Sequence, residues 1–292
     1  MSFSCYRQKI QTWGVLNVTP DSFSDGGESF SAGSVQQKLT DWASLCDVVD
    51  VGAQSTAPKA LAIDEKEEIA RLEKYLLPAF ERWPMGLTLS LDTFRPATVR
   101  WLLARKPVGA ELIWNDVSGV LDEESLALLE EHPELRYVLT FTQLTQKSQT
   151  PEHSKILSDQ DVTQGARRFF LRNFEVLLKR GLFSRTIADP GFGFCKKREQ
   201  NFELMAALPE LMDELGQPQW LWGLSRKSFL RGEEERDPRD PATRRTLDAG
   251  ALLWTERALK ALTQPHQVGL RVHDPAMVRG LVLSEELRRQ GC

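Results

Sequence analysis

Six segments rich in apolar residues end in polar side chains of the kinds that bind substrates or take part in chemistry. A single aspartate or asparagine after a strand often caps the next helix or orders a turn, so one such group carries little weight. Six groups in one chain are harder to explain by local structure and indicate a shared binding site. The groups are Asn17–Gly27, Asp92–Thr93, Asn115–Ser118, Asp189–Phe194, Ser225–Ser228 and Arg271–Asp274.

Three of these side chains suit a flat, nitrogen-rich heterocycle. Asp92 and Asp189 only accept hydrogen bonds when ionised, whereas Asn115 both donates and accepts. A buried pair of carboxylates also stabilises a positive charge that develops on such a ring. We therefore expect Asp92, Asn115 and Asp189 to hold a heterocyclic electrophile.

A second set of side chains suits a phosphate group with a divalent ion. Asn17 offers an oxygen ligand, Arg271 a planar guanidinium and His273 an imidazole. Lys227 lies between the two sets in chain order and could serve either. Together the two sets predict a site that removes an anionic leaving group from a heterocycle.

The elements that would position these residues alternate regularly along the chain. Regular alternation of strands and helices predicts a parallel sheet covered by helices, and eight units in 292 residues favour a closed barrel. Barrel active sites lie at the carboxyl ends of the strands, where the polar groups occur. The predicted fold is α/β, a (β/α)8 TIM barrel in one domain over residues 1–292. Its strands are Trp13–Val18, Val48–Gly52, Leu87–Asp92, Leu112–Val117, Tyr137–Thr142, Thr186–Asp189, Trp220–Ser225 and Val268–Val272.

Helix ends between the strands have local signals. Starts are predicted at Asp64 with Glu67 three residues on, at Pro96, at Asp122, and at Ser158 ahead of Asp161, and stops at Gly181 and Gly216. Gln143–Asp159 and Arg231–Asp240 are predicted loops. His132, His153 and His266 lack metal-ligand spacing and are predicted to be surface or turn residues.

Charge and composition argue against several classes of partner. Lys+Arg 37 against Asp+Glu 41 gives a net charge of −4, so no global positive field would attract nucleic acid or a membrane surface. The four cysteines form no CxxC pair, and Met1–Trp13 lacks the apolar stretch of a signal peptide. We expect a cytoplasmic protein that binds neither nucleic acid nor membrane.

Five motifs, in chain order, resemble those of the dihydropteroate synthases, a family of pterin-binding barrel enzymes. They extend across most of the chain: Asn17–Phe23, Asp50–Gly52 with Ser55–Thr56, Asp189–Phe194, Ser225–Phe229 and Arg271–Asp274. The resemblance implies that 6-hydroxymethyl-7,8-dihydropterin diphosphate loses pyrophosphate with Mg²⁺ assistance. The amine of 4-aminobenzoate would then attack the resulting pterin cation to give 7,8-dihydropteroate in folate biosynthesis. It also implies a homodimer, although Met277, Val278, Leu281 and Val282 could equally pack on the barrel.

The resemblance also assigns roles. Catalysis would involve Asp92, which stabilises the cation, together with Lys227, Asp25 and Phe23. The pterin would be held by Asp92, Asn115, Asp189 and Lys227. The diphosphate would be held by Asn17, Thr56, Arg271 and His273, and Asn17 would also bind the metal. The 4-aminobenzoate would be held by Phe194, Lys227, Ser228 and Pro58. Phe23, Ser24, Asp25, Thr56 and Pro58 would lie on two loops that close over the site and exclude water.

Three positions depart from the family pattern. Ala57 occupies the place of a loop arginine, and we hypothesise that Lys59 substitutes for it. Leu139–Gln143 lacks a usual histidine and methionine, which predicts a changed wall of the pterin pocket. Cys195 replaces a glycine and is predicted to be a small apolar filler.

Three other interpretations were weighed. Gly191–Gly193 with Lys196 lacks the third glycine of a dinucleotide loop. A pterin-dependent methyltransferase domain would share Asp92, Asn115 and Asp189 but has no evident use for Lys227, Ser228, Arg271 and His273. A pterin-binding paralogue without catalysis, or with altered specificity, is motivated by Ala57 and the changed fifth strand.

Overall fold

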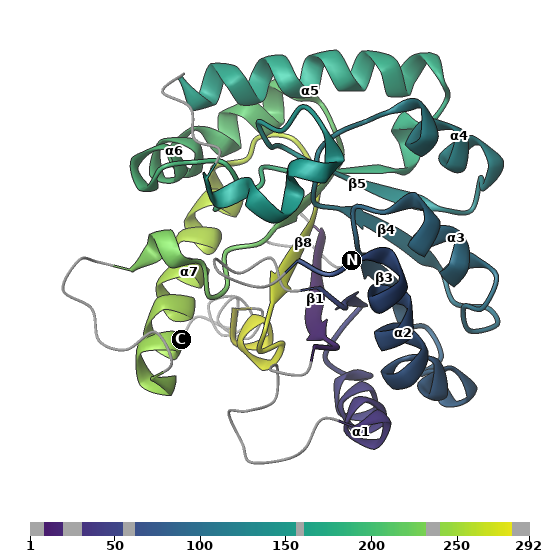
Figure 1. Ribbon diagram of the computed structural model, residues 1–292. Coiled ribbons are helices and arrows are strands. Elements are labelled where there is room, and N and C mark those ends of the chain that lie inside the picture. Colours follow the sequence, from purple (N-terminus) through teal and green to yellow (C-terminus); the bar gives the residue numbers. More distant parts are fainter. Residues whose placement is uncertain (1–8, 20–30, 55–61, 156–160, 232–239, 282–292) are drawn as a thin grey trace, which may run out of the picture.

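The computed structural model describes residues 9–19, 31–54, 62–155, 161–231 and 240–281, and it shows a barrel of parallel strands inside a ring of helices (Figure 1). The strands close in sequence order from β1 to β8, and β8 pairs with β1. They are β1 (Lys9–Asn17), β2 (Val48–Gly52), β3 (Thr88–Asp92), β4 (Leu112–Asp116), β5 (Arg136–Thr140), β6 (Thr186–Asp189), β7 (Gln219–Trp222) and β8 (Gln267–Val272). The predicted (β/α)8 barrel is confirmed.

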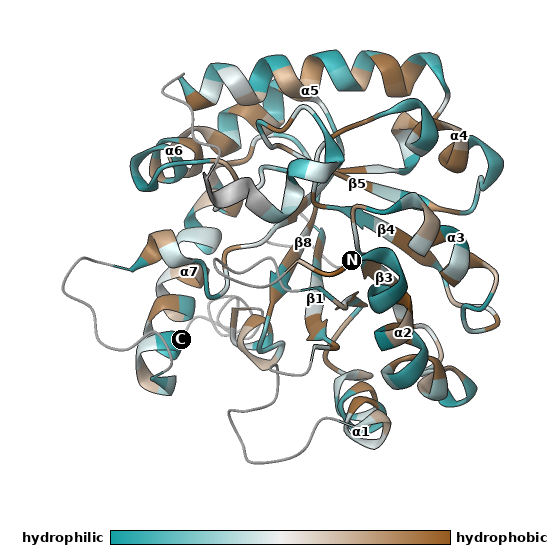
Figure 2. Ribbon diagram, viewed as in Figure 1, coloured by the Kyte–Doolittle hydropathy of each residue, from teal (hydrophilic) through white to brown (hydrophobic). Residues whose placement is uncertain are grey.

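The helices that surround the barrel follow the strands in chain order (Figure 1). They are α1 (Ala32–Trp42), α2 (Glu65–Tyr75), α3 (Pro96–Leu103), α4 (Glu123–Glu131), α5 (Val162–Lys179), α6 (Arg198–Leu215) and α7 (Pro241–Ala261). Short 3₁₀ segments occur at Leu77–Arg82, Lys147–Lys155, Phe183–Arg185 and Ser228–Leu230. Figure 2 shows hydrophilic and hydrophobic residues mixed along α2 and α5, as expected of helices with one face on the barrel.

The interior of the barrel changes from apolar to polar along the strands. A buried cluster inside it consists of Trp13, Val48, Ile113, Val138, Ile187 and Leu221. Because alternate side chains of a strand point to the same face, the residues two positions later also point inward. Those residues are Val15, Asp50, Asn115, Thr140, Asp189 and Gly223. The carboxyl end of the barrel is therefore polar inside because of the sequence of the strands themselves.

The helix starts are explained by side-chain caps. Asp64 accepts a hydrogen bond from the Glu67 amide at 2.8 Å, and Asp122 accepts one from the Ser125 amide at 2.9 Å. Pro96 is the first residue of α3, as predicted. The cap of α5 is Asp161, whose Oδ1 accepts from the Gln164 amide at 3.0 Å, and the predicted cap Ser158 lies outside the described residues.

Two further expectations were wrong in part. Gln143–Asp159 was predicted to be a loop, but Lys147–Lys155 forms a 3₁₀ helix in which the Thr150 hydroxyl donates to the Lys147 carbonyl at 2.7 Å. His266 is buried rather than a surface residue, because its ring contacts the Gln217 carbonyl at 3.1 Å and Asp213 at 3.0 Å. Of the predicted loop Arg231–Asp240, residues 232–239 lie outside the described residues.

Glycine is required at Gly119, where the loop after β4 crosses the end of β5. Its φ is +67°, and an added Cβ would lie 2.1 Å from the Thr140 carbonyl oxygen. The C-cap of α6, Gly216, has a φ of +64° but nothing within 4 Å of that position. The two glycines share a left-handed backbone and differ in the space around them.

We therefore predict unequal costs for alanine at the two sites. Gly216→Ala should lower the free energy of unfolding by about 1 to 2 kcal/mol, the cost of a left-handed backbone. Gly119→Ala should lower it by about 2 to 5 kcal/mol, because overpacking is added. Urea denaturation of both variants measures the difference, and equal midpoints would contradict the contact at Thr140.

A search of the described helices for a long, apolar segment that could cross a membrane found none.

Candidate active site

A cavity opens at the carboxyl end of the barrel. Its walls come from β3, β4, β6 and β8 and from the segments that follow β4, β6 and β7. The lining residues are Asp92, Asn115, Val117, Asp189, Phe192, Phe194, Gly223, Lys227 and Arg271. The structure thus brings together the four residues predicted to hold the pterin, and it adds Phe194 and Arg271 from the other predicted sets.

Arg271 connects opposite sides of this cavity. It lies on β8, and its guanidinium reaches carboxylates of both β2 and β3. Its Nε donates to Asp50 Oδ2 at 2.6 Å and its Nη2 donates to Asp92 Oδ2 at 2.7 Å. Burial alone would lower the pKa of Arg271, but the two carboxylates outweigh it and raise the pKa above its ordinary value. The arginine is therefore held as a cation at a defined place.

Asp92 is a carboxyl group whose ionisation is poised near neutrality. Burial raises its pKa to about 7, with further increases from the charges of Asp50 and Glu68, while Arg271 and Lys227 lower it. A shift of this size at a cavity wall is characteristic of a functional group.

Asn115 and Asp189 present acceptors on the far wall. Asn115 Nδ2 donates to Asp50 Oδ2 at 3.0 Å, whereas its buried Oδ1 has no hydrogen-bond partner in the described part of the chain. Asp189 Oδ1 accepts from the Gly191 amide at 2.7 Å, and burial raises the pKa of this carboxyl. An unsatisfied buried acceptor is costly, so the orientation of Asn115 suits a ligand that donates N–H groups.

Lys227 lies over an aromatic ring beside these acceptors. Its Nζ is 4.4 Å from the centre of the Phe194 ring. Burial, followed by the charge of Arg271, lowers the pKa of Lys227 to about 8, against the opposing effect of Asp189 and Asp92. Gly193 has a φ of +82° and its added Cβ would lie 3.3 Å from Lys227 Cδ, so glycine keeps space for the lysine.

His273 marks a positively charged region next to the cavity. Its Nδ1 lies 3.1 Å from Ser225 Oγ. Burial lowers the pKa of His273 well below its ordinary value, and the cations Arg226, Arg271, Lys227 and Lys38 lower it further. A neutral imidazole among cations suits an anionic ligand.

Asn17, the last residue of β1, lies on the same side of the barrel. Its Oδ1 is 3.5 Å from the position of a Cβ added at Gly52, and Asp92 Cβ is equally near that position. Any side chain at Gly52 would occupy the space between Asn17 and Asp92. Both distances are ordinary van der Waals contacts, so Asn17, Gly52 and Asp92 lie together on one side of the barrel.

Lys196 organises the loops behind the site. Its buried Nζ donates to the carbonyl oxygens of Phe141 and Gly191 at 2.9 Å and of Phe194 at 3.1 Å. Cys195, beside it, is fully buried, as predicted for a small filler. No residue of Leu139–Gln143 is among the residues that line the cavity, and a changed wall of the pterin pocket stays a prediction. Through Lys196, the segment that follows β5 is connected to the loop that follows β6.

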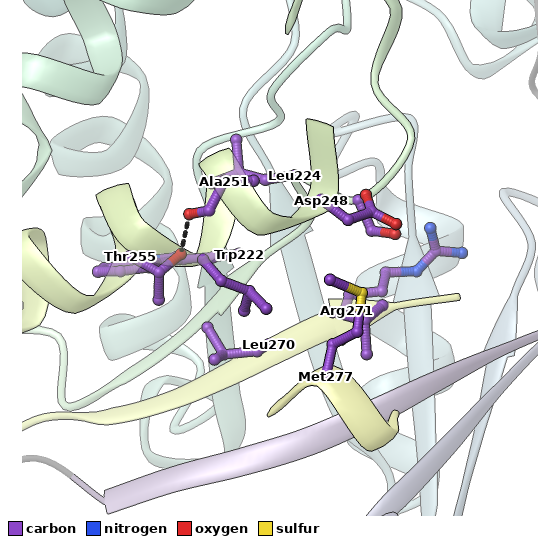
Figure 3. Close-up of a pocket in the computed structure, with 11 residues that line it drawn as sticks. Trp222, Leu224, Asp248, Ala251, Thr255, Leu270, Arg271 and Met277 are labelled. Carbon is purple, nitrogen blue, oxygen red and sulfur yellow. Dashed lines mark hydrogen bonds between the residues drawn. The ribbon is translucent and has the colours of Figure 1, made fainter. Parts of the chain in front are cut away.

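A second cavity lies on the outer side of Arg271, between α7 and strands β7 and β8. Figure 3 shows Trp222, Leu270 and Thr255 around it, with the Arg271 guanidinium directed away from them. The Thr255 hydroxyl donates to the Ala251 carbonyl at 2.9 Å. The stem of Arg271 is thus packed against an apolar layer while its charged end faces the barrel.

Several predicted residues lie elsewhere. Ser228 begins a 3₁₀ turn, is exposed and does not line the cavity. The loop residues Phe23, Ser24, Asp25, Thr56, Ala57, Pro58 and Lys59 lie outside the described residues, and substitution by Lys59 stays a prediction.

Sequence reasoning missed the roles of Asp50 and Lys38. Asp50 had a signal, since it is a charged residue within the apolar run Val48–Val51. Lys38 had none, because a lysine on an amphipathic helix is ordinarily solvated.

Comparisons with known proteins agree with this geometry. Residues 13–260 match the family model of pterin-binding enzymes. The dihydropteroate synthase of Synechocystis is 35% identical over 229 residues, which cover 76% of this chain and 74% of that protein.

Solved structures are similar as well. The dihydropteroate synthase of Xanthomonas albilineans with 4-aminobenzoic acid superposes with a TM-score of 0.75 and 30% identity, over 96% of this chain and 93% of that one. The same enzyme in complex with 7,8-dihydropteroate gives a TM-score of 0.72 and 29% identity, over 96% and 94%. The chain therefore belongs to the pterin-binding enzyme family and, within it, to the dihydropteroate synthases.

Proposed function

We propose that this protein condenses 6-hydroxymethyl-7,8-dihydropterin diphosphate with 4-aminobenzoate, giving 7,8-dihydropteroate and pyrophosphate. The observation that carries the proposal is a cavity that combines the unpartnered Oδ1 of Asn115 with the carboxyls of Asp92 and Asp189, next to the cations around His273. The similarity to synthases with 4-aminobenzoic acid and with 7,8-dihydropteroate supports it.

The pterin would bind between β3, β4 and β6. Its ring N–H groups and amino group donate hydrogen bonds, and the Asn115 amide oxygen and the two carboxyls accept them. Lys227 and Asn17 would complete the set at the ring edge and at the diphosphate. Because each acceptor is buried, a ring without these donors would leave them unsatisfied, which gives strong selectivity.

The leaving group would depart toward Arg271 and His273. Loss of pyrophosphate breaks the bond between carbon and oxygen, and the electron pair leaves with the oxygen. The pterin keeps a positive charge that an ionised Asp92 carboxylate stabilises through space. Arg271 is already held in place by Asp50, so little reorganisation is needed when the negative charge grows on the leaving oxygen.

The aminobenzoate would approach on the side of Phe194 and Lys227. The ammonium of Lys227 can pair with the carboxylate of this substrate, while the Phe194 ring offers a face for its aromatic ring. We propose that Ser228, Pro58, Thr56, Phe23 and Asp25 act from the segments that border this side. Attack of the amine on the pterin carbon forms the new bond and releases one proton.

Mg²⁺ fits the residues present. The described residues contain no group of three or more histidine, cysteine or acidic side chains placed to hold a metal. Magnesium bound with substrate phosphates needs few protein ligands, and Asn17 Oδ1 would supply one of them. When bound, the ion would neutralise part of the charge of the diphosphate.

Pyrophosphate release and dihydropteroate formation test the proposal together. Purified protein with Mg²⁺ should release pyrophosphate only when the pterin diphosphate and 4-aminobenzoate are both present. Pterin binding by calorimetry without release would instead identify a pterin-binding paralogue that does not catalyse.

We further propose that residues 1–292 form one domain and that the protein is a cytoplasmic homodimer. The thiols of Cys46 and Cys195 are free, which suits a reducing compartment. A groove between α6 and α7, with Trp254 in its wall and Leu253 63% exposed, offers an apolar face to a second copy. Val278 and Leu281 are buried in the described chain and do not contribute to that face. Sedimentation velocity of the wild type and of Leu253→Glu distinguishes a dimer from a monomer.

A further inference from the structure

Asp50 is a charged residue in the interior of the barrel that does not line the cavity. Its side chain is fully buried in β2, one layer below Asp92 and Gly52. A carboxylate at this depth is expensive unless its oxygens are satisfied. Its role must therefore lie in the groups that contact it.

Three donors from three other strands satisfy Asp50. Oδ1 accepts from the Ser90 hydroxyl on β3 at 2.6 Å. Oδ2 accepts from Asn115 Nδ2 on β4 at 3.0 Å and from Arg271 Nε on β8 at 2.6 Å. Two of these donors, Asn115 and Arg271, line the substrate cavity.

These contacts determine which atoms the two cavity residues present. An asparagine side chain has one donor end and one acceptor end, and it can rotate to exchange them. Because Asp50 only accepts, the Nδ2 end of Asn115 must face Asp50 and the Oδ1 end must face the ligand. Likewise, engagement of Arg271 Nε by Asp50 aligns Nη2 with Asp92 at 2.7 Å.

We propose that Asp50 is a positioning residue of the synthase, which orients the Asn115 amide and the Arg271 guanidinium without touching the substrate. The inference rests on the proposed function. It assigns a role within that site to a residue that belongs to one of the five motifs, does not line the cavity, and receives no role from the resemblance.

The electrostatic surroundings of Asp92 support a separable readout. The charged groups that act on Asp92 are Asp50 from β2, Glu68 from α2, Lys227 after β7 and Arg271 from β8. Asp50 raises the pKa of Asp92, so its neutralisation should lower that pKa. Arg271 would then pair with Asp92 alone. If activity requires ionised Asp92, the acidic limb of the pH–rate profile, where activity falls as Asp92 is protonated, would then move to lower pH.

A matched control comes from the neighbouring strand. Asp116 is also fully buried, accepts from Tyr137 OH at 3.0 Å and pairs with Lys147 Nζ at 2.8 Å. It follows Asn115 and therefore points to the opposite face of β4, away from the cavity. Asp50→Asn and Asp116→Asn both remove a buried carboxylate, but only the first touches the site.

The experiment compares the two variants in turnover, pterin affinity and pH dependence. Asp50→Asn should lower kcat/KM by on the order of 10²-fold, because a displacement of about 1 Å in the groups that position a substrate lowers the rate by about that factor. It should also weaken pterin binding, measured by calorimetry, and shift the acidic limb of the rate profile to lower pH. Asp116→Asn should lower the unfolding midpoint but leave the acidic limb and pterin affinity unchanged. Ser90→Ala removes only one hydrogen bond to Asp50 and should show a smaller effect in the same direction. This milder variant tests the proposal if Asp50→Asn does not fold.

If Asp50→Asn and Asp116→Asn lose kcat/KM equally, in proportion to their loss of stability, and the acidic limb does not shift, Asp50 only supports the fold. A wild type that binds pterin but does not turn over would refute the proposed function instead. In that case the pterin affinities of the three variants still decide whether Asp50 orients Asn115.

Discussion

Asp92→Asn is expected to lower kcat for dihydropteroate formation by about 10²- to 10³-fold, the loss usual when one preorganised charge partner of a transition state is removed. The substitution keeps the shape of the side chain and an acceptor oxygen, but it removes the negative charge that, in the proposed mechanism, stabilises the pterin cation. Arg271 Nη2, now 2.7 Å from Asp92 Oδ2, would also lose one of its two carboxylates. Steady-state rates at saturating substrate measure the effect.

Stability gives the control for this variant. The pKa of Asp92 in the folded protein is about 7 and lies above the ordinary value, so ionisation of this group weakens the fold as pH rises toward 7. Asparagine does not ionise, so at pH 8 the unfolding midpoint of Asp92→Asn should not fall below that of the wild type. An inactive variant with a much lower midpoint would mean that Asp92 mainly supports the fold.

The wild-type rate should depend on pH with limbs on either side of a narrow optimum. In the proposed mechanism an ionised Asp92 stabilises the cation, so kcat/KM should fall as pH drops through about 7. In the same mechanism a protonated Lys227 pairs with the aminobenzoate carboxylate, so kcat/KM should fall as pH rises through about 8. The maximum is therefore expected between these two values.

Two substitutions of Lys227 separate the upper limb from other causes. Lys227→Met removes the charge and should lower kcat/KM by at least about 10²-fold, with no alkaline limb. Lys227→Arg keeps a charge that does not titrate in this range, so residual activity should persist above pH 9. If the alkaline limb persists in Lys227→Arg, the fall in kcat/KM at high pH is caused by a group other than Lys227.

The barrel and most of the candidate site could be predicted from the sequence because the relevant signals are local. Strand-length apolar runs alternate with capped helices, as at Asp64 and Pro96. In a parallel barrel the carboxyl ends of all strands share one face, so residues such as Asp92 and Asn115 had to converge there. The predicted loop over the 3₁₀ segment Lys147–Lys155 was less successful, because helix signals in polar segments compete closely.

What only the tertiary structure decided is which side chains share hydrogen bonds across strands. Asn115 lies 65 residues and Arg271 lies 221 residues from Asp50 in sequence, yet one oxygen of the Asp50 carboxylate accepts hydrogen bonds from both. The sequence by itself determined that polar residues would meet at one end of the barrel, since strand alternation and parallel order are local properties. Depth in the barrel places Asp50 below the cavity, and burial raises the pKa of Asp92 to about 7. These properties depend on burial and on neighbouring charges, which arise only when distant strands close into a barrel.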